Sequence, residues 1–153
     1  MKISEFLRED LVTDALKASD KASAIDELCA LVAARRPDLS ATVLAEVLSE
    51  REKLGSTGVG EGVAIPHGKL GALTGLVAAF GRTVQGVEFN AIDGRPTHLF
   101  FVLFAPENSA GIHLKALARI SRLFKSAAFR SAILEAKDAA GIYKLIADED
   151  ARY

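Results

Sequence analysis

A single histidine follows directly after a glycine-rich segment and a proline. The segment Gly55–Gly62 holds four glycines and two hydroxyl side chains, and the short apolar run Val63–Ile65 comes next. Pro66 gives no N–H to a strand ladder and favours an extended residue before it, so we expect the strand to end there and to present His67 at a rim of the sheet. Glycines leave backbone N–H groups uncovered, and successive N–H groups bind anions. The spacing predicts a histidine beside a loop suited to phosphate.

Phosphoryl transfer is the chemistry that fits these residue types. An imidazole titrates near pH 6.5, so at neutral pH His67 offers a lone pair that can accept a phosphoryl group and later release it. Arg51 lies one turn after Val47 at the end of an apolar helical stripe, and its planar guanidinium can stabilise the transferring group. Both residues also have a structural interpretation, a histidine that supports the fold and an arginine that extends into solvent. The loop adds neutral donors from Gly55, Ser56, Thr57 and Gly58.

Three other charged or titratable residues need an interpretation. His113 is expected in the first turn of a helix, where the N-terminus favours anions, and the alternative is a solvated histidine at a helix start. His98 directly precedes the most apolar segment, so we expect it at the start of that strand, far from the rim where phosphate would bind, in a structural role. Glu61 lies between loop glycines and is expected to face solvent.

Composition excludes several classes of function. The 153 residues are 50% hydrophobic and 25% charged, with a net charge of −1, so no basic excess is available to bind nucleic acid. Cys29 is the only cysteine, which excludes an intrachain disulfide and a cysteine cage for metal and fits a reducing cytoplasm. It lies on an apolar helix face as expected of a core residue. The first ten residues carry acids where a signal peptide needs an apolar core, and no uncharged apolar run approaches the ~20 residues of a membrane span.

Hydrophobic periodicity predicts helices at both ends of the chain and strands in the middle. Leu99–Ala105 is apolar at every position, which is typical of a central strand covered on both faces, and Leu76–Phe80 has a similar pattern. We therefore predict an α/β fold, a single-domain sandwich whose mixed parallel and antiparallel sheet is flanked by helices on both faces. Before the strands we expect a short helix at 3–7, an extended piece at 11–16, one helix capped by Ser19 or Asp20 and a second helix capped by Ser40. A short strand is expected at 86–89. After the strands we expect one helix capped by Asn108 or Ser109, a second helix at 129–134, a third at 142–146, and a frayed acidic tail at 148–150.

The segment Gly60–Gly68, with Arg51-Glu52 and Gly55–Gly58 before it, resembles a known signature. It is similar to the phosphorylation site of the fructose/mannitol-type enzyme IIA domains of the bacterial phosphotransferase system, and Gly68–Leu70 resembles the nitrogen-regulatory branch most. The resemblance covers essentially all of residues 1–153 and implies that His67 is the phosphorylated residue. It also implies that Arg51 lies near the phosphohistidine and that the second histidine, His113, faces it.

This resemblance implies a phosphocarrier without cofactor or metal. The expected donor is the phosphohistidine of an HPr-like protein, the dedicated nitrogen-branch homologue NPr, and the expected output is regulation of target proteins by phosphorylation state. The alternative within the class is a free-standing IIA component of a fructose- or mannitol-type permease, which passes phosphate to a IIB partner. Two other classes stay open: a hydrolase with zinc held by His67, His113 and an acid, and an interaction module that works without phosphorylation.

Overall fold

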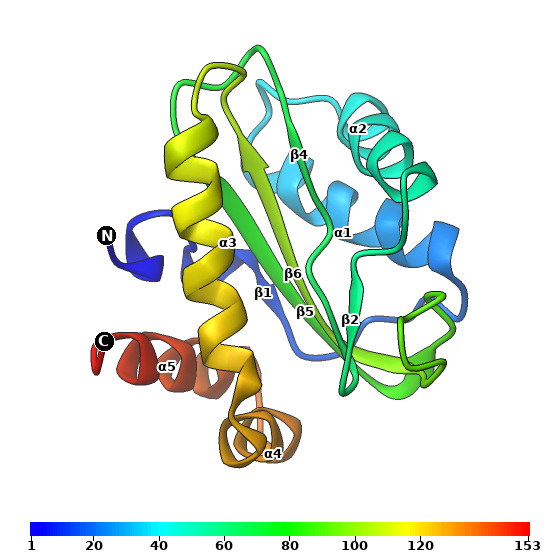
Figure 1. Cartoon of the computed structure of the whole chain (residues 1–153), viewed down its shortest axis with the longest axis vertical. Coiled ribbons are helices and arrows are strands. Elements are labelled where there is room, and N and C mark those ends of the chain that lie inside the picture. Colours follow the sequence, from blue (N-terminus) through cyan, green and yellow to red (C-terminus); the bar gives the residue numbers. More distant parts are fainter.

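A six-stranded mixed sheet forms the middle layer of the molecule, with helices on both of its faces (Figure 1). The computed structural model describes residues 1–153 and confirms the expected fold class. The strands are β1 (Val12–Thr13), β2 (Gly58–Gly60), β3 (Val63–Ala64), β4 (His67–Lys69), β5 (Val77–Val87) and β6 (Thr97–Ala105). The helices are α1 (Lys21–Arg35), α2 (Ala41–Lys53), α3 (Ala110–Lys125), α4 (Ala127–Glu135) and α5 (Ala139–Asp150), and two 3-10 turns span Ile3–Glu5 and Glu9–Leu11.

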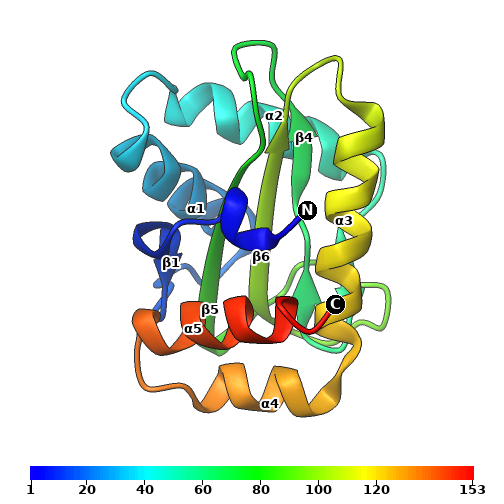
Figure 2. The same cartoon turned by 90° about the vertical axis from the view of Figure 1, so that its left-hand side faces the viewer.

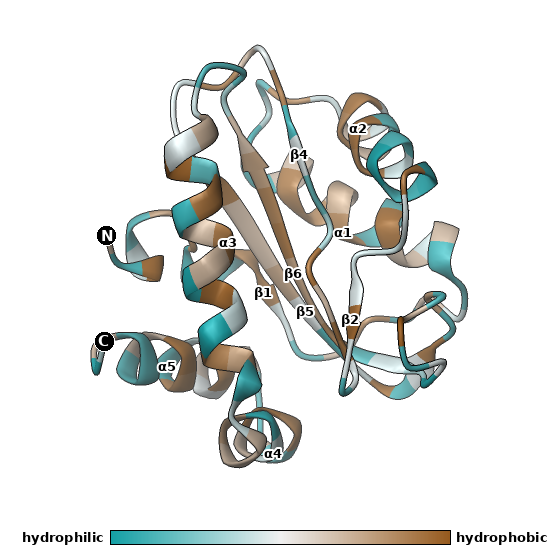
Figure 3. Ribbon diagram, viewed as in Figure 1, coloured by the Kyte–Doolittle hydropathy of each residue, from teal (hydrophilic) through white to brown (hydrophobic).

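Strand β6 is the central strand of this sheet. The strand order is β1-β5-β6-β3-β2, and β4 also pairs with β6. Strand β5 runs antiparallel to β6, whereas β3 and β4 run parallel to it, so the sheet is mixed as predicted. Every residue of Leu99–Ala105 is buried, which confirms the assignment of this run as a strand covered on both faces. Figure 3 shows the apolar character of the two long strands.

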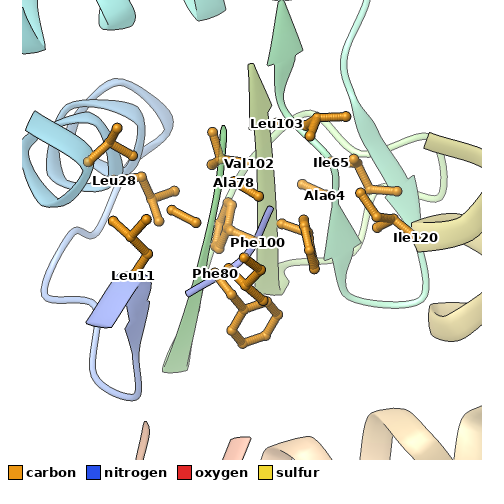
Figure 4. Close-up of a cluster of buried hydrophobic side chains, with 14 of the residues drawn as sticks. Leu11, Leu28, Ala64, Ile65, Ala78, Phe80, Phe100, Val102, Leu103 and Ile120 are labelled. Atoms are coloured by element: carbon orange, nitrogen blue, oxygen red, sulfur yellow. The ribbon is translucent and has the colours of Figure 1, made fainter. Parts of the chain in front are cut away.

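Helices α1 and α2 pack on one side of the sheet and α3 on the other, with α4 and α5 at one end (Figure 2). The core extends through both layers: Figure 4 shows Leu11 and Leu28 on one side of the central strands and Ile65 and Ile120 on the other. Cys29 is also buried on α1, and burial raises the pKa of its thiol to about 12, as expected for a core residue.

The helix starts follow from local capping chemistry. The Asp20 carboxylate accepts the Ser23 N–H at the start of α1, and the Ser40 hydroxyl accepts the Val43 N–H at the start of α2. Both caps were predicted. Ser109 occupies the N-cap position of α3, but its hydroxyl donates to the Pro106 carbonyl and leaves the first amides of that helix without a side-chain cap.

The prediction of two short strands, one at 76–80 and one at 86–89, was wrong. Residues Val77–Val87 form a single strand, β5, whose register against β6 shifts between Arg82 and Val87. Arg82 is buried in this strand because its guanidinium donates to the backbone carbonyls of Asp14, Ile133, Leu134 and Ala136. A buried charge with this many acceptors is a tertiary feature that the hydrophobic pattern does not reveal.

The prediction of a frayed acidic tail was also wrong. Helix α5 continues to Asp150, whose side chain is 2% exposed. Its carboxylate accepts the Ile3 N–H at 2.6 Å and forms an ion pair with Arg119. Asp150 therefore joins the first turn of the chain to α3 and α5.

Candidate functional site

His67 lies on β4, between α2 and α3 (Figure 1). Strand β3 pairs with β6 up to Ala64, and β4 resumes the pairing with His67 opposite Leu103. The predicted end of the strand at Pro66 was thus only an interruption, because the Pro66 carbonyl still accepts the Leu103 N–H at 3.0 Å. The ladder loses one donor at the proline and continues. The pairing of β3 and β4 with β6, on both sides of Pro66, therefore fixes the position of His67.

The hydrogen bond of the His67 ring determines its tautomer. Nδ1 lies 2.7 Å from the Ile65 carbonyl oxygen. A carbonyl oxygen only accepts, so Nδ1 carries the proton and Nε2 carries the free lone pair. Burial lowers the pKa of His67 below its ordinary value, and the charge of Arg51 acts in the same direction. His67 is therefore neutral near pH 7, with Nε2 as its nucleophilic atom.

His113 lies in the first turn of α3 and faces His67. The two ring centroids are 5.5 Å apart and the ring planes meet at 77°. His113 is only 7% exposed, and its Nε2 is buried without a hydrogen-bond partner. Burial lowers the pKa of His113, with smaller contributions in the same direction from His67 and Lys69. The structure thus brings together the two histidines that the sequence selected and leaves one ring nitrogen unpaired.

Arg51 is held near His67 by a neutral group. Its guanidinium donates to the Gly55 carbonyl at 2.9 Å and has no carboxylate within ion-pair distance. The charge is therefore free to act on His67 and on an anion beside it. Arg51, His67 and His113 all line one cleft of about 760 Å³ between α2, β4 and α3. The other lining residues are Val43, Glu46, Val47, Glu50, Leu54, Gly68 and Lys69.

The loop donors that were expected to bind phosphate are already hydrogen-bonded within the protein. The Ser56 hydroxyl donates to the Phe89 carbonyl at 2.7 Å, and the Gly58 N–H donates to the Ser56 hydroxyl oxygen at 3.0 Å. The Thr57 N–H and hydroxyl both donate to the Glu52 carboxylate, and the Gly55 N–H donates to the Glu52 carbonyl. Phosphate binding by Gly55, Ser56, Thr57 and Gly58 stays a prediction, one that requires these bonds to be exchanged. The observed contact of the loop with the site is the Gly55 carbonyl on Arg51.

Gly68 permits close packing of α2 on β4. A Cβ atom at this position would lie 2.4 Å from Cγ1 of Val47, on α2. The missing side chain lets α2 approach β4 closely, and this close packing brings Arg51 to the same cleft as His67.

Two residues lie away from this cleft. His98 is near the start of β6, where its Nδ1 lies 3.0 Å from the Thr83 carbonyl, as expected for a structural histidine. Glu61 is exposed and lies 3.7 Å from Arg95 and 3.6 Å from Arg130. No group of three or more His, Cys, Asp or Glu side chains is arranged to hold a metal ion, so the geometry gives no support to the zinc alternative.

Sequence reasoning missed Lys69 and gave Glu52 no role. Lys69 lines the cleft and adds a second cation. Residues two apart in a strand share a face, so the pair His67 and Lys69 would have been found if residues 67–69 had been assigned as a strand. Glu52 is 5% exposed and accepts from Lys21 and Thr57, contacts that no sequence pattern indicates.

The fold and this cleft agree with one protein family. The family described as "Phosphoenolpyruvate-dependent sugar phosphotransferase system, EIIA 2" matches residues 5–149, and the chain belongs to it. It is therefore a phosphocarrier component of the phosphotransferase system. None of its helices is both long and apolar enough to cross a bilayer.

Within this family the chain is similar to proteins of two branches. It is 41% identical to a nitrogen regulatory protein of Bradyrhizobium diazoefficiens, over 96% of this chain and 95% of the relative. The crystal structure of the nitrogen regulatory protein IIA-Ntr from Neisseria meningitidis superposes with a TM-score of 0.89 at 35% identity, covering 94% of this chain and 98% of that one. The chain is also 36% identical to the fructose-specific EIIABC component of Bacillus subtilis, over 98% of this chain but only 24% of that longer protein.

Proposed function

We propose that the chain accepts a phosphoryl group on Nε2 of His67 from the phosphohistidine of an HPr-like carrier, the nitrogen-branch homologue NPr. We further propose that it works in the cytoplasm and regulates target proteins according to its phosphorylation state. The observation that carries the proposal is the bond from His67 Nδ1 to the Ile65 carbonyl. This bond leaves Nε2 as the one nucleophilic nitrogen of the ring, beside a cation and a second histidine in an open cleft.

In the proposed step, the Nε2 lone pair of His67 attacks the phosphorus atom of the donor phosphohistidine. A new N–P bond forms as the N–P bond of the donor breaks, and its electron pair returns to the donor imidazole. No proton is transferred at His67, because Nδ1 keeps its hydrogen on the Ile65 carbonyl throughout. The reverse of the same step lets the chain pass the group onward.

The residues around Nε2 are suited to stabilise the phosphoryl group in flight. Catalysis of phosphoryl transfer consists mainly of positioning and of compensating the charge on the equatorial oxygens. Arg51 provides a permanent cation with free donors, and Lys69 adds a second positive charge at the cleft. Nε2 of His113 is buried and has no hydrogen-bond partner, and we expect it to donate to an oxygen of the phosphoryl group on His67.

Apolar side chains around the cleft support docking of a partner protein. Val43 on α2 and Leu54 at the C-cap of that helix line the cleft and are 43% and 84% exposed. Ile112 and Leu114 flank His113 on α3 and are 52% and 68% exposed. Transfer between two histidines requires the partner to cover this surface. A phosphate adds a charge of about −1.5 to −2 at its centre. A target protein that buries the same surface would therefore distinguish the two states.

A second candidate function is that of a IIA component of a sugar permease, which passes phosphate to a IIB partner. The observation that favours it is the 36% identity to the fructose-specific relative, almost the same as the identity to IIA-Ntr of known structure. The cleft geometry fits both functions because each requires the same phosphohistidine.

The test is reconstitution with an enzyme I-type kinase, phosphoenolpyruvate and either of the two HPr-type donors. We expect one acid-labile phosphoryl group per chain, gained faster from NPr than from the sugar-branch donor, and none on a His67→Ala variant. Subsequent addition of a fructose-type IIB domain separates the two candidates, since only a permease component should transfer efficiently to it. An unlabelled wild-type chain with both donors would contradict both functions.

A further inference from the structure

We infer that Glu52 is a positioning residue that fixes both His67 and Arg51 in their reactive arrangement. The inference rests on the proposed function, since it concerns the same phosphoryl transfer. Glu52 does not line the cleft; it reaches the two residues through other groups, and its charge also acts on the His67 ring, whose pKa it raises against the larger lowering by burial.

The Glu52 carboxylate is buried and receives three donors. Its side chain is only 5% exposed. One oxygen accepts the Thr57 N–H at 3.1 Å and pairs with the Lys21 ammonium at 2.9 Å, and the other accepts the Thr57 hydroxyl. A buried carboxylate with charged and neutral donors forms stronger hydrogen bonds than an exposed one. Glu52 therefore fixes Thr57 by both its backbone and its side chain.

A chain of hydrogen bonds leads from Thr57 to the His67 ring. The Thr57 carbonyl accepts the Ile65 N–H at 3.0 Å, and the Ile65 carbonyl lies 2.7 Å from His67 Nδ1. Both bonds involve Ile65, so the position of Thr57 helps to fix where the Ile65 carbonyl lies. Because that carbonyl selects the tautomer of His67, Glu52 helps to keep Nε2 unprotonated.

The same loop leads from Thr57 to Arg51. Gly55 lies two residues before Thr57, and its carbonyl accepts from the Arg51 guanidinium at 2.9 Å. The loop has a second anchor on the other side, where the Ser56 hydroxyl donates to the Phe89 carbonyl. Glu52 is thus the charged anchor of a loop that reaches His67 through Ile65 on one side and contacts Arg51 on the other.

Lys21 provides the positive charge that allows the Glu52 carboxylate to lie near a proposed phosphate site. Its ammonium pairs with Glu52 and lies 4.7 Å from the centroid of the Phe89 ring, so it is held between an anion and an aromatic face. The pairing compensates the negative charge of Glu52, which would otherwise oppose the approach of a phosphoryl group.

Two variants and one control test this inference. Glu52→Gln keeps the shape of the side chain but removes the charge and one acceptor, and Thr57→Val removes only the hydroxyl. Glu135→Gln removes a charge from an exposed position on α4 and is the matched control. Thermal unfolding first establishes that each variant is folded. The ring ¹⁵N signals of His67, recorded by NMR on the unphosphorylated proteins, then report the tautomer, and the rate of phosphoryl acceptance is measured over pH 6 to 8.

We expect the wild type and Glu135→Gln to hold the Nδ1–H tautomer. Glu52→Gln should show a mixture of tautomers, a shifted pH profile and acceptance slower by at least about tenfold, because fewer molecules present an unprotonated Nε2 and Arg51 is held less well. Thr57→Val should fall between them. A Glu52→Gln variant with the tautomer, the pH profile and the rate of the wild type would overturn the inference, and if that variant does not fold, unchanged values in Thr57→Val overturn it. If the tautomer changes in Glu52→Gln but the wild type accepts no phosphoryl group, the positioning role of Glu52 is upheld and the proposed function is refuted.

Discussion

Two histidines of the molecule have the same tautomer, His98 near the start of the central strand and His67 on β4 beside the other end of that strand, and only His67 has the surroundings expected of a phosphoryl acceptor. His67 and His98 both have Nδ1 within hydrogen-bond distance of a backbone carbonyl, at 2.7 and 3.0 Å. In each case the bond leaves Nε2 with the lone pair. Tautomer selection therefore does not by itself create a phosphoryl acceptor.

The difference lies in the charges nearby. The cavity beside His98 also contains two arginines, Arg95 and Arg130, and the Glu61 carboxylate lies between them, 3.7 Å from one and 3.6 Å from the other. At His67 the neighbouring Arg51 is held by a neutral carbonyl and has no carboxylate within ion-pair distance, although Glu46 and Glu50 also line that cleft. We infer that a cation without a carboxylate partner, more than a correctly oriented ring, distinguishes the proposed phosphoryl acceptor.

The largest expected effect is that of deleting each histidine in turn. His67→Ala should abolish phosphoryl acceptance because Nε2 of His113, the other histidine of the cleft, is buried and closed to the donor. His98→Ala should accept one phosphoryl group per chain at the wild-type rate. Intact-mass measurement after incubation with the phosphorylated donor gives both results. Full labelling of the His67→Ala variant would remove His67 from the role assigned to it.

The next effect concerns Arg51, the cation that has no carboxylate within ion-pair distance. Arg51→Lys keeps the charge but loses the planar fork, so one charged hydrogen bond in the transition state should be lost. This costs roughly 1.5–3 kcal/mol, which slows acceptance about 10- to 150-fold. Arg152→Lys, a change at an exposed arginine near the C-terminus that does not line the cleft, is the control in the same quenched-flow measurement. A wild-type rate in Arg51→Lys would make the comparison of charges wrong.

A smaller effect is expected at His113. His113→Ala should still be phosphorylated on His67 but should transfer more slowly, by up to about tenfold, because a neutral hydrogen bond contributes roughly 0.5–1.5 kcal/mol. His113→Gln should recover part of the rate, since an amide retains a donor. Rates with the same donor over pH 6 to 8 provide the measurement. Identical rates and pH profiles in all three proteins would reduce His113 to a structural residue.

The smallest effect is a pH dependence of stability. Burial lowers the pKa of both His67 and His113 below the value of about 6.5 in the unfolded chain. Below pH 6.5 the unfolded chain therefore binds more protons than the folded chain, and the free energy of unfolding should decrease as the pH falls. Urea unfolding at pH 7.5 and 5.5 measures this change. A double variant, His67→Gln with His113→Gln, should lose part of it, and an unchanged slope would argue against buried neutral rings.

The features that the sequence predicted are those that depend on local chemistry. The caps at Asp20 and Ser40 act within one helical turn, and the apolar run Leu99–Ala105 carries its burial in its own composition. The pairing of His67 with His113 was found through a family resemblance, because the two residues lie 46 positions apart and no spacing rule joins them.

The features that the sequence missed depend on contacts between distant segments. Strand β4 continues after Pro66 because β6 supplies its partners, and Asp150 is buried because Ile3 and Arg119 meet it. The loop donors of Ser56 and Thr57 appeared free in the sequence, yet Phe89 and Glu52 accept from them. A glycine-rich pattern predicts available N–H groups only when no other part of the chain reaches them.

The most direct test of the account is to determine which nitrogen of His67 carries the phosphoryl group. The chain is labelled with ¹⁵N, phosphorylated by its donor and examined by long-range ¹H–¹⁵N NMR of the imidazole signals. We predict phosphate on Nε2 of His67, with Nδ1 still protonated and bonded to the Ile65 carbonyl. Phosphate on Nδ1, or on His98 or His113, would contradict the claim that the Ile65 carbonyl selects the reactive nitrogen.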